Sequence, residues 1–341
     1  MKCDDGLEYY SDLVYNYAHL ILCKEEINMD LMHYQAKEPF TQKHLLTLQD
    51  WSEDEIYQSL SLALQLKAMQ KSGQKQTCLS GKTLAMIFAK SSTRTRVSFE
   101  VGTSQLGGSA LFLSTADIQL GRGEPISDTA QVLSRMVDGI MIRTFKQSDL
   151  EALAKYGSIP IINGLTDEFH PCQVLADLMT IREYKGTLAG LKLTYIGDGN
   201  NMANALIVGG IKTGMKVAVA TPAKYKPDAA VMEWASANGD FTWTEDVLEA
   251  AKDADAVYTD VWASMGMEKE AQQRKIDFKG YQINDSVMAV TKSDAMVMHC
   301  LPAHREEEIT AKVFEEHANE IFDEAENRKH VQKAILVKCF E

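Results

Sequence analysis

Short apolar runs alternate with helical patterns along most of the chain from residue 82 onward. Runs of strand length lie at residues 84–88, 109–113, 139–143 and 159–162, and a second set lies at 193–196, 217–220, 256–258 and 296–298. Apolar residues at helical spacing fill the intervals, most clearly at 170–185, 202–212 and 246–252. This alternation is typical of parallel sheets covered by helices. The two sets predict an α/β protein with two domains, each a mostly parallel sheet.

The segments around these two sets complete the expected organisation. Ser52-Glu53-Asp54-Glu55 is a capping box and begins the first clear helix, whereas residues 1–38 are acidic, Tyr-rich and precede it. We expect residues 1–38 to be an extension of undefined role, 39–180 the first domain and 181–320 the second. The helix near 170–185 bridges the two domains. Residues 321–341 form a last helix that packs back on the first domain.

Length, charge and cysteine usage narrow the class of protein. The 341 residues suit two domains of about 150 residues each. A net charge of −13 argues against nucleic acid or an anionic membrane as partner. The six cysteines are scattered without a Cys-x-x-Cys pair, no apolar stretch approaches ~18 residues, and the N-terminus lacks the pattern of a secretory signal. We expect a reduced, cytoplasmic protein without a structural zinc site.

The segment Ser92-Thr93-Arg94-Thr95-Arg96 is the most informative stretch of the chain. It follows a buried-type strand and opens a helix, whose first N–H groups and dipole favour anions. Guanidinium groups add forked donors that match phosphate oxygens. The alternative is a solvated loop, but five oxyanion-binding side chains in a row exceed what a loop requires. No nucleotide P-loop motif occurs, so we predict a site for a small phosphorylated metabolite.

Other chemically distinctive residues also fall at strand ends, where ligands bind in parallel sheets. Arg143 ends one strand, Asn201 follows another, and Asp260 ends a third. His170 begins the bridging helix and can donate to a developing oxyanion, with Gln173 on the same helical face. Taken alone, His170 is better explained as a helix cap or a residue that fills a gap in the packing, but its position after a strand end favours a functional role. For Asp260, an ammonium-binding role and a solvated loop carboxylate are about equally good interpretations.

Three further motifs leave alternatives open. Residues 196–201 resemble a dinucleotide fingerprint but lack its third glycine, so an NAD site is a weak alternative. His299 and Cys300 are neighbours at the end of a strand and are expected to point to opposite faces, which argues against a thiol nucleophile or metal site. Arg328 either reaches the cleft or pairs with Glu324, and the second is the commoner arrangement.

With these segments together, the chain resembles the ornithine carbamoyltransferases over residues 39–341. The matching motifs are Ser92-Thr93-Arg94-Thr95-Arg96, His170-Pro171-Cys172-Gln173, Asp260 with Ser264-Met265-Gly266, and His299-Cys300-Leu301-Pro302. The resemblance implies transfer of the carbamoyl group of carbamoyl phosphate to the δ-amine of L-ornithine. Residues 39–180 would then bind carbamoyl phosphate and 181–320 ornithine, without a metal or an organic cofactor. A carbamoyltransferase for another amine, such as putrescine, and a non-catalytic protein on this scaffold are the alternatives.

The resemblance also implies a role for each site residue. Those for carbamoyl phosphate are Ser92, Thr93, Arg94, Thr95, Gln119, Arg143, His170, Gln173, the Leu301 carbonyl and Arg328. Those for ornithine are Asn201, Asp260, Ser264 and Met265. The catalytic set would be Arg143, His170, Asp260 and Cys300. Gln119 would be lent to the phosphate site of a neighbouring subunit, which implies a homotrimer with shared active sites.

Overall fold

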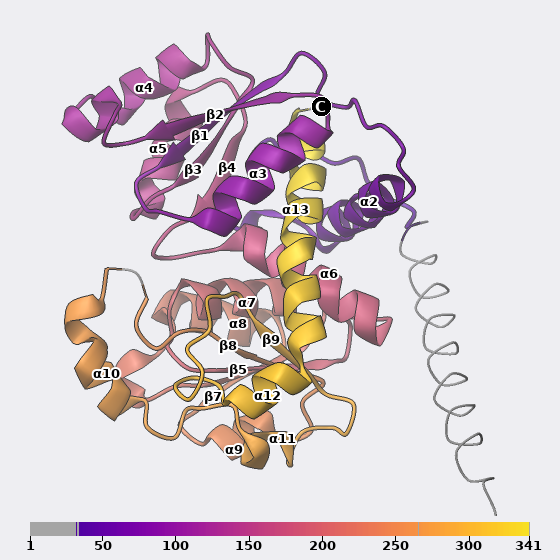
Figure 1. Cartoon of the computed structure of the whole chain (residues 1–341), viewed down its shortest axis with the longest axis vertical. Helices are drawn as coiled ribbons and strands as arrows, with labels where there is room; N and C mark the ends of the chain where they lie inside the picture. The colour runs from indigo at the N-terminus through magenta and orange to yellow at the C-terminus, as the bar shows by residue number, and fades with distance from the viewer. Residues whose placement is uncertain (1–31, 33, 265, 341) are drawn as a thin grey trace, which may run out of the picture.

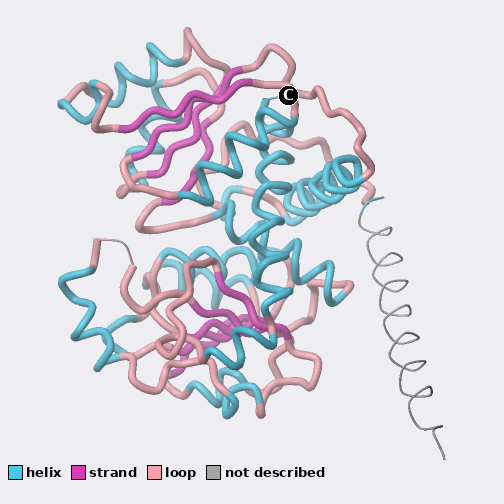
Figure 2. The backbone as a smooth tube through the Cα atoms, in the orientation of Figure 1, coloured by secondary structure: helices cyan, strands magenta, loops and turns pink. Residues whose placement is uncertain are grey.

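The computed structural model describes residues 32, 34–264 and 266–340. Most of the extension 1–38, and Met265 of the expected ornithine site, lie outside these residues. The described chain forms two lobes, each built on a parallel sheet flanked by helices (Figures 1 and 2). The predicted fold class is therefore confirmed.

The first lobe contains a parallel sheet in the order β2-β1-β3-β4. Its strands are β1 (Thr83–Phe88), β2 (Ser109–Ser114), β3 (Gly139–Arg143) and β4 (Ile161–Leu165). Its helices are α3 (Thr93–Gln105), α4 (Ile126–Leu133) and α5 (Gln147–Tyr156), with the 3-10 turn η2 (Gln119–Arg122) after β2. The central strands β1 and β3 are apolar along their length because both of their faces are buried. The strand predicted at 159–162 instead runs from 161 to 165, so Asn163 and Gly164 belong to it.

The second lobe contains a parallel sheet in the order β7-β6-β5-β8-β9. Its strands are β5 (Lys192–Ile196), β6 (Lys216–Ala220), β7 (Phe241–Thr244), β8 (Ala256–Thr259) and β9 (Met296–His299). Its helices are α7 (Asn201–Lys212), α8 (Ala229–Asn238), α9 (Val247–Ala251), α10 (Ala271–Asp277), α11 (Asp285–Met288) and α12 (Ala311–Glu316), with 3-10 turns η3 (Ala223–Tyr225) and η4 (Glu268–Glu270). The sequence missed β7, a four-residue edge strand.

Two long helices, α6 (Pro171–Lys185) and α13 (Ala318–Phe340), join the lobes. A third long helix, α2 (Glu53–Lys71), is preceded by the turn η1 (Leu48–Asp50) and packs on both of them. α13 packs on α6, α2, α3 and β9, and so runs from the second lobe to the first (Figure 1). One continuous apolar core contains residues from both sheets. Within it, Lys67 of α2 donates to Glu183 of α6 at 2.7 Å and to Asn327 of α13 at 2.8 Å. This buried network fixes the three helices relative to one another.

The predicted capping box at the start of α2 is confirmed. The Ser52 hydroxyl accepts from the Glu55 N–H at 3.1 Å, and the Glu55 carboxylate accepts from the Ser52 N–H at 2.8 Å. None of the helices within the described residues is long and apolar enough to cross a bilayer.

Candidate active site

Residues of both lobes meet where the strands end. Arg94, at the start of α3, donates from Nη2 to the Leu301 carbonyl just beyond β9 at 2.7 Å. Asn201, at the start of α7, donates to the carbonyl of Thr166 beyond β4 at 2.6 Å. The first-lobe and second-lobe residues predicted from the sequence therefore face a common site.

The turn between β1 and α3 has the expected strand-to-helix geometry. Ser92 is the N-cap of α3, and its hydroxyl accepts from the Thr95 N–H at 3.1 Å. Thr95 is buried, with its hydroxyl near two guanidinium groups. The inclusion of Arg96 in the phosphate site was wrong. Two residues along a helix turn a side chain by about 200°, and Arg96 instead lies over the Phe112 ring at 3.8 Å and pairs with Glu100.

Arg143 ends β3 at an irregularity in the sheet. The register with β4 shifts between Ile142 and Arg143, so that Ile142 pairs with Asn163 but Arg143 with Leu165. Gly164 is the skipped residue, and a Cβ on it would lie 2.5 Å from the Met141 sulfur. Such bulges redirect side chains near active sites. Arg143 is buried, and its Nη1 lies 3.5 Å from the Thr95 hydroxyl.

Arg94, Arg143 and Arg328 converge around His170. Burial and then the three guanidiniums lower the pKa of His170 well below its usual range, so its ring is neutral. Burial, Arg328 and Arg94 lower the pKa of Arg143 to about 10. Among the described ion pairs, none includes any of these three arginines. Arg143 and Arg328 are buried, whereas Arg94 is exposed. A cluster of cations without carboxylate partners is suited to an anionic ligand.

Several donors of this cluster face no protein partner. Arg143 Nε, Arg328 Nε and His170 Nδ1 are buried, and within the described part of the chain they make no hydrogen bond. Buried polar atoms are normally paired, so unpaired ones gathered at one place indicate a site that a ligand completes.

Arg328 of α13 reaches the cleft and does not pair with Glu324, contrary to the commoner arrangement. It donates from Nη1 to Gln173 Oε1, and its Nη2 lies 3.3 Å from the Thr95 hydroxyl. Gln173 in turn donates from Nε2 to Asp177 Oδ1 and to Glu324 Oε1, each at 2.8 Å. The sequence did not predict a role for Asp177, although its position four residues after Gln173 places both on one face of α6.

Asp260 forms the carboxylate end of the site and is buried. Its Oδ1 accepts from the Val261 N–H at 2.8 Å and lies 3.1 Å from the Cys300 sulfur. Its Oδ2 accepts from Asn200 Nδ2 at 2.9 Å, and the same amide nitrogen lies 3.4 Å from the Ser264 hydroxyl. Asn200, which was not among the predicted binding residues, therefore contacts Asp260, whereas Asn201 holds the Thr166 carbonyl.

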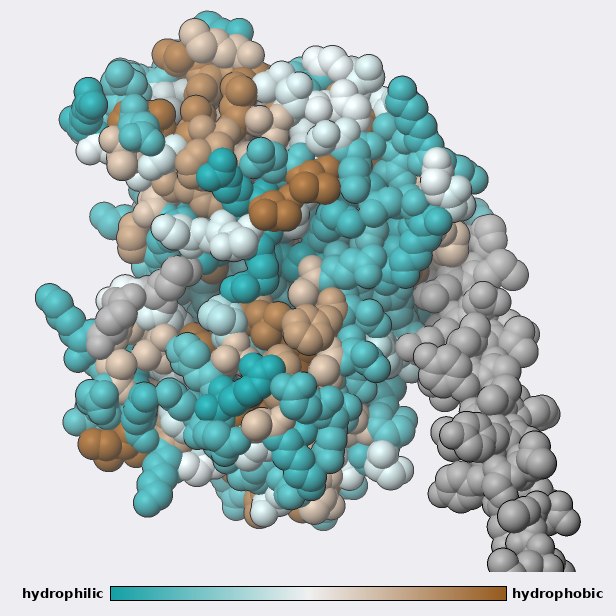
Figure 3. All heavy atoms as spheres, in the orientation of Figure 1, coloured by the Kyte–Doolittle hydropathy of each residue, from teal (hydrophilic) through white to brown (hydrophobic). Residues whose placement is uncertain are grey.

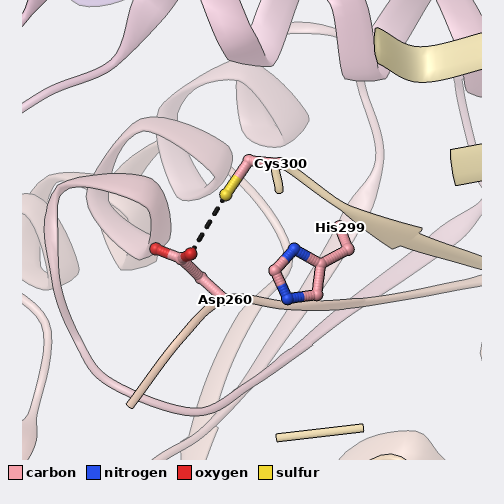
Figure 4. Close-up of side chains that lie close together, drawn as sticks. All are labelled: Asp260, His299 and Cys300. Atoms are coloured by element: carbon pink, nitrogen blue, oxygen red, sulfur yellow. Dashed lines mark hydrogen bonds between the residues drawn. The ribbon is translucent and has the colours of Figure 1, made fainter. Parts of the chain in front are cut away.

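The expectation that His299 and Cys300 point to opposite faces was wrong. β9 ends at His299, so strand alternation does not extend to Cys300, and the potential ligand atoms of Asp260, His299 and Cys300 lie within 4.8 Å of one another (Figure 4). His299 nevertheless has partners on both ring nitrogens. Nδ1 accepts from the Leu301 N–H at 2.9 Å, and Nε2 lies 3.1 Å from the Glu308 carboxylate. His299 could bind a metal ion, or accept a proton from Cys300, only if one of these two contacts were broken.

The same contact to His299 fixes the backbone of Leu301. Leu301 has a φ of +57°, which is uncommon for a residue with a side chain. Its N–H is held by His299 Nδ1, and its carbonyl accepts from Arg94. Cys300 itself is a protonated thiol, because burial and Asp260 raise its pKa well above the usual range.

A buried ion pair supports the Asp260 loop from behind, and the sequence did not predict it. Arg274 of α10 donates from Nη1 to Asp198 Oδ2 and to the Trp262 carbonyl, both at 2.8 Å. Gln119, by contrast, lies exposed in η2, and Ser264 is half-buried at the edge of the loop.

Comparisons with known proteins agree with this arrangement. Residues 43–183 match the family model "Aspartate/ornithine carbamoyltransferase, carbamoyl-P binding domain", and residues 189–339 match the model "Aspartate/ornithine carbamoyltransferase, Asp/Orn binding domain". The chain is 54% identical over 317 residues to the ornithine carbamoyltransferase of Oceanobacillus iheyensis, which covers 92% of this chain and 97% of the relative.

Solved structures agree as well. The ornithine carbamoyltransferase of Pyrococcus furiosus has a TM-score of 0.82 at 52% identity, covering 86% of this chain and 95% of that chain. The anabolic ornithine carbamoyltransferase of Campylobacter jejuni has a TM-score of 0.81 at 42% identity, covering 86% of this chain and 98% of that chain. The chain therefore belongs to the aspartate/ornithine carbamoyltransferase family. Within that family, these relatives act on ornithine according to their names.

Proposed function

We propose that this chain transfers the carbamoyl group of carbamoyl phosphate to the δ-amine of L-ornithine, giving L-citrulline and phosphate. The observation that carries the proposal is the cluster of Arg94 with the buried Arg143 and Arg328 around the neutral His170. Three cations without protein anions match a dianionic phosphate together with a developing oxyanion.

The phosphate group binds at the start of α3 in this proposal. Ser92, Thr93, Arg94 and Thr95 supply hydroxyl and guanidinium donors, and the first N–H groups of the helix add their partial positive charge. Arg328 contacts the carbamoyl phosphate from α13. Arg94 now donates to the Leu301 carbonyl, so substrate binding must transfer this guanidinium from the carbonyl to the phosphate. That exchange frees the carbonyl to accept from the carbamoyl NH2, together with Gln173 Oε1.

Arg143 and His170 stabilise the transition state. Attack of the amine on the carbonyl carbon moves an electron pair onto the carbonyl oxygen, and fixed donors there are worth about 3–4 kcal/mol each. Neutral His170 acts as a hydrogen-bond donor and transfers no proton. The tetrahedral intermediate then collapses, the C–O bond to phosphate breaks, and the amine proton passes to the departing phosphate or to solvent.

Ornithine binds on the second-lobe side. Asp260, Asn201, Ser264 and Met265 are the proposed contacts, and Asn200 joins them through its hydrogen bond to Asp260. The nucleophile must be an uncharged amine, so Asp260 orients it without holding it as an ammonium ion. Cys300, as a protonated thiol near Asp260, lies beside the reacting amine and does not attack.

The remaining features of the proposal concern assembly, location and organisation. Residues 39–180 would bind carbamoyl phosphate and residues 181–320 would bind ornithine. Residues 321–341 would form the last helix, which packs back on the first domain. A cytoplasmic homotrimer is proposed, in which Gln119 of one subunit completes the phosphate site of the next. Exposed apolar side chains on α3 and the edge strand β2 support such an interface; they are Val97, Val101, Leu111 and Phe112. Figure 3 shows hydrophobic atoms gathered on this lobe.

A citrulline-forming assay tests the proposal. The purified chain is supplied with carbamoyl phosphate and either ornithine or putrescine, and the ureido product and phosphate are measured together. We expect equal amounts of citrulline and phosphate with ornithine and little product with putrescine. Faster turnover of putrescine would assign the chain to another amine, and no turnover of either would refute the proposal. Light scattering of the same sample measures whether it is a trimer.

A further inference from the structure

Two carboxyl groups lie buried beneath the carbamoyl end of the site, and the proposed reaction does not use them. Asp177 of α6 and Glu324 of α13 are both fully buried. They flank Gln173 Nε2, which donates to one oxygen of each at 2.8 Å.

We propose that Asp177 and Glu324 share one proton and act as positioning residues that aim two acceptors, Gln173 Oε1 and the Leu301 carbonyl, at the carbamoyl NH2. This inference rests on the proposed function, because it concerns how that site distinguishes a carbamoyl group from an acyl group of the same shape.

The orientation of the Gln173 amide follows from its partners. An amide nitrogen has two N–H donors, and both are used by the carboxyl pair. The amide oxygen must therefore point the other way, toward Arg328 Nη1, with which it is hydrogen-bonded. Gln173 cannot reverse its amide without turning an oxygen toward two carboxyl groups. It therefore presents an acceptor to the substrate and no donor.

Glu324 also holds the second acceptor. Its Oε2 accepts from the His299 N–H at 3.0 Å, immediately before Cys300 and Leu301. Its Oε1 accepts from Gln173 and from the Tyr258 hydroxyl, which lies at 3.1 Å. One carboxylate thus joins α6 of the first lobe to β8 and β9 of the second.

The donors around the pair indicate where the proton resides. Glu324 accepts from three donors, which favours its ionised form, whereas Asp177 accepts from Gln173 alone and its Oδ2 has no protein N–H or O–H partner among the described residues. Burial and the adjacent Glu324 raise the pKa of Asp177 well above its usual range. A protonated Asp177 donates to Glu324 and still accepts from Gln173.

This assignment predicts that two isosteric substitutions differ in effect. In Asp177→Asn, the amide can accept from Gln173 and donate to Glu324, as the protonated acid does. In Glu324→Gln, the new NH2 group replaces one of the two carboxylate oxygens. In one orientation it faces the His299 N–H, and in the other it faces Gln173 Nε2, so a donor meets a donor in both. The first variant should preserve the acceptors, and the second should misplace them.

The experiment measures two quantities in native chain and variants: kcat/KM for carbamoyl phosphate, and the inhibition constant of acetyl phosphate relative to the KM of carbamoyl phosphate. Acetyl phosphate carries a methyl group in place of the NH2. We expect Asp177→Asn to stay within about threefold of native in both. Glu324→Gln should lose about 10- to 100-fold in kcat/KM and a similar factor in discrimination, as expected for misplaced buried hydrogen bonds.

Asp255→Asn provides a matched control. Asp255 is also buried and accepts from a backbone N–H, that of Lys192, at 2.8 Å, but it lies at the start of β8, at the opposite end of that strand from Asp260. It should lower the unfolding temperature without changing discrimination. A Glu324→Gln variant that keeps discrimination would overturn the inference.

A loss above tenfold in kcat/KM or in discrimination for Asp177→Asn would also overturn the inference. If Glu324→Gln does not fold, Asp177→Asn alone is the test. Absence of citrulline formation in the native chain would instead refute the proposed function.

Discussion

Replacing Arg143 by methionine separates the catalytic contribution of this residue from its effect on stability. The burial and neighbouring guanidiniums that lower its pKa from 12.5 to about 10 correspond to a cost of about 3 kcal/mol for holding its charge in the folded protein. Arg143 is charged at pH 7 in both the folded and the unfolded chain, so this cost is present throughout the neutral range and is relieved only above pH 10.

Arg143→Met therefore removes an unfavourable charge and a donor to the transition state at once. Its hydrogen bond to Thr95, at 3.5 Å, is long and contributes little. We expect kcat to fall about 10²–10³-fold. The unfolding temperature should stay the same or rise, by up to about 2–4 °C for each kcal/mol gained.

Arg274→Met is the matched control, because Arg274 and Arg143 are equally buried at 5% exposure. Arg274 differs in its partner: it is paired with Asp198 at 2.8 Å, and Asp198 and the nearby Glu270 raise its pKa despite burial. Its removal leaves a buried carboxylate unpaired and should cost about 3–5 kcal/mol of stability. Because Arg274 also holds the Trp262 carbonyl, the KM for ornithine should rise.

The assays are steady-state citrulline formation and thermal unfolding at pH 7, each on the native chain and both variants. Turnover of Arg143→Met within tenfold of native would contradict the assignment of this guanidinium to the transition state. A fall in its unfolding temperature as large as that of Arg274→Met would show that Arg143 has a structural role instead.

Three further predictions concern other parts of the molecule. Arg94→Ala should lose most activity and unfold at the native temperature, since Arg94 is exposed; near-normal turnover would refute its phosphate role. An NMR titration of labelled histidine should find the pKa of His170 well below the usual range, because burial and the neighbouring guanidiniums lower it; charging near pH 6.5 would contradict the site's electrostatics. A chain starting at Met32 keeps every described contact and should fold normally, whereas one starting at Glu38 loses the Tyr34–Asp54 hydrogen bond of 2.6 Å and should be less stable.

The sequence predicted the fold well because its signals were local and strong. Central parallel strands are buried on both faces and appear as continuous apolar runs, as β1 and β3 do. β7 escaped because Phe241-Thr242-Trp243-Thr244 is short, alternates with polar residues and lies at an edge of the sheet. Edge strands of this kind resemble loops in a single sequence.

The site was predictable as far as sheet topology determines it. Arg94, Arg143 and Asp260 were found because they follow parallel strands, whose carboxyl ends adjoin the ligand site. Arg96 was misassigned because it was included for its residue type alone. The periodicity of the helix places its side chain on a different face from that of Arg94. Asn200 was left out of the binding set because the resemblance implied a role for Asn201 alone.

The supporting network required the tertiary structure. Gln173 and Glu324 are 151 residues apart, and no local pattern connects them. One signal was present: Glu324 precedes Arg328 by four residues, as Gln173 precedes Asp177, so each pair shares a helical face. That α6 and α13 pack together, and so bring the two pairs into contact, follows only from the three-dimensional arrangement.

The most direct test of the central claim is a crystal structure with a bisubstrate analogue that joins a phosphonate to ornithine. We predict that the phosphonate lies at the start of α3, with Arg94 released from the Leu301 carbonyl and donating to it, and that the ornithine part lies beside Asp260. A phosphonate bound elsewhere, or Arg94 still held by Leu301, would contradict this account of the site.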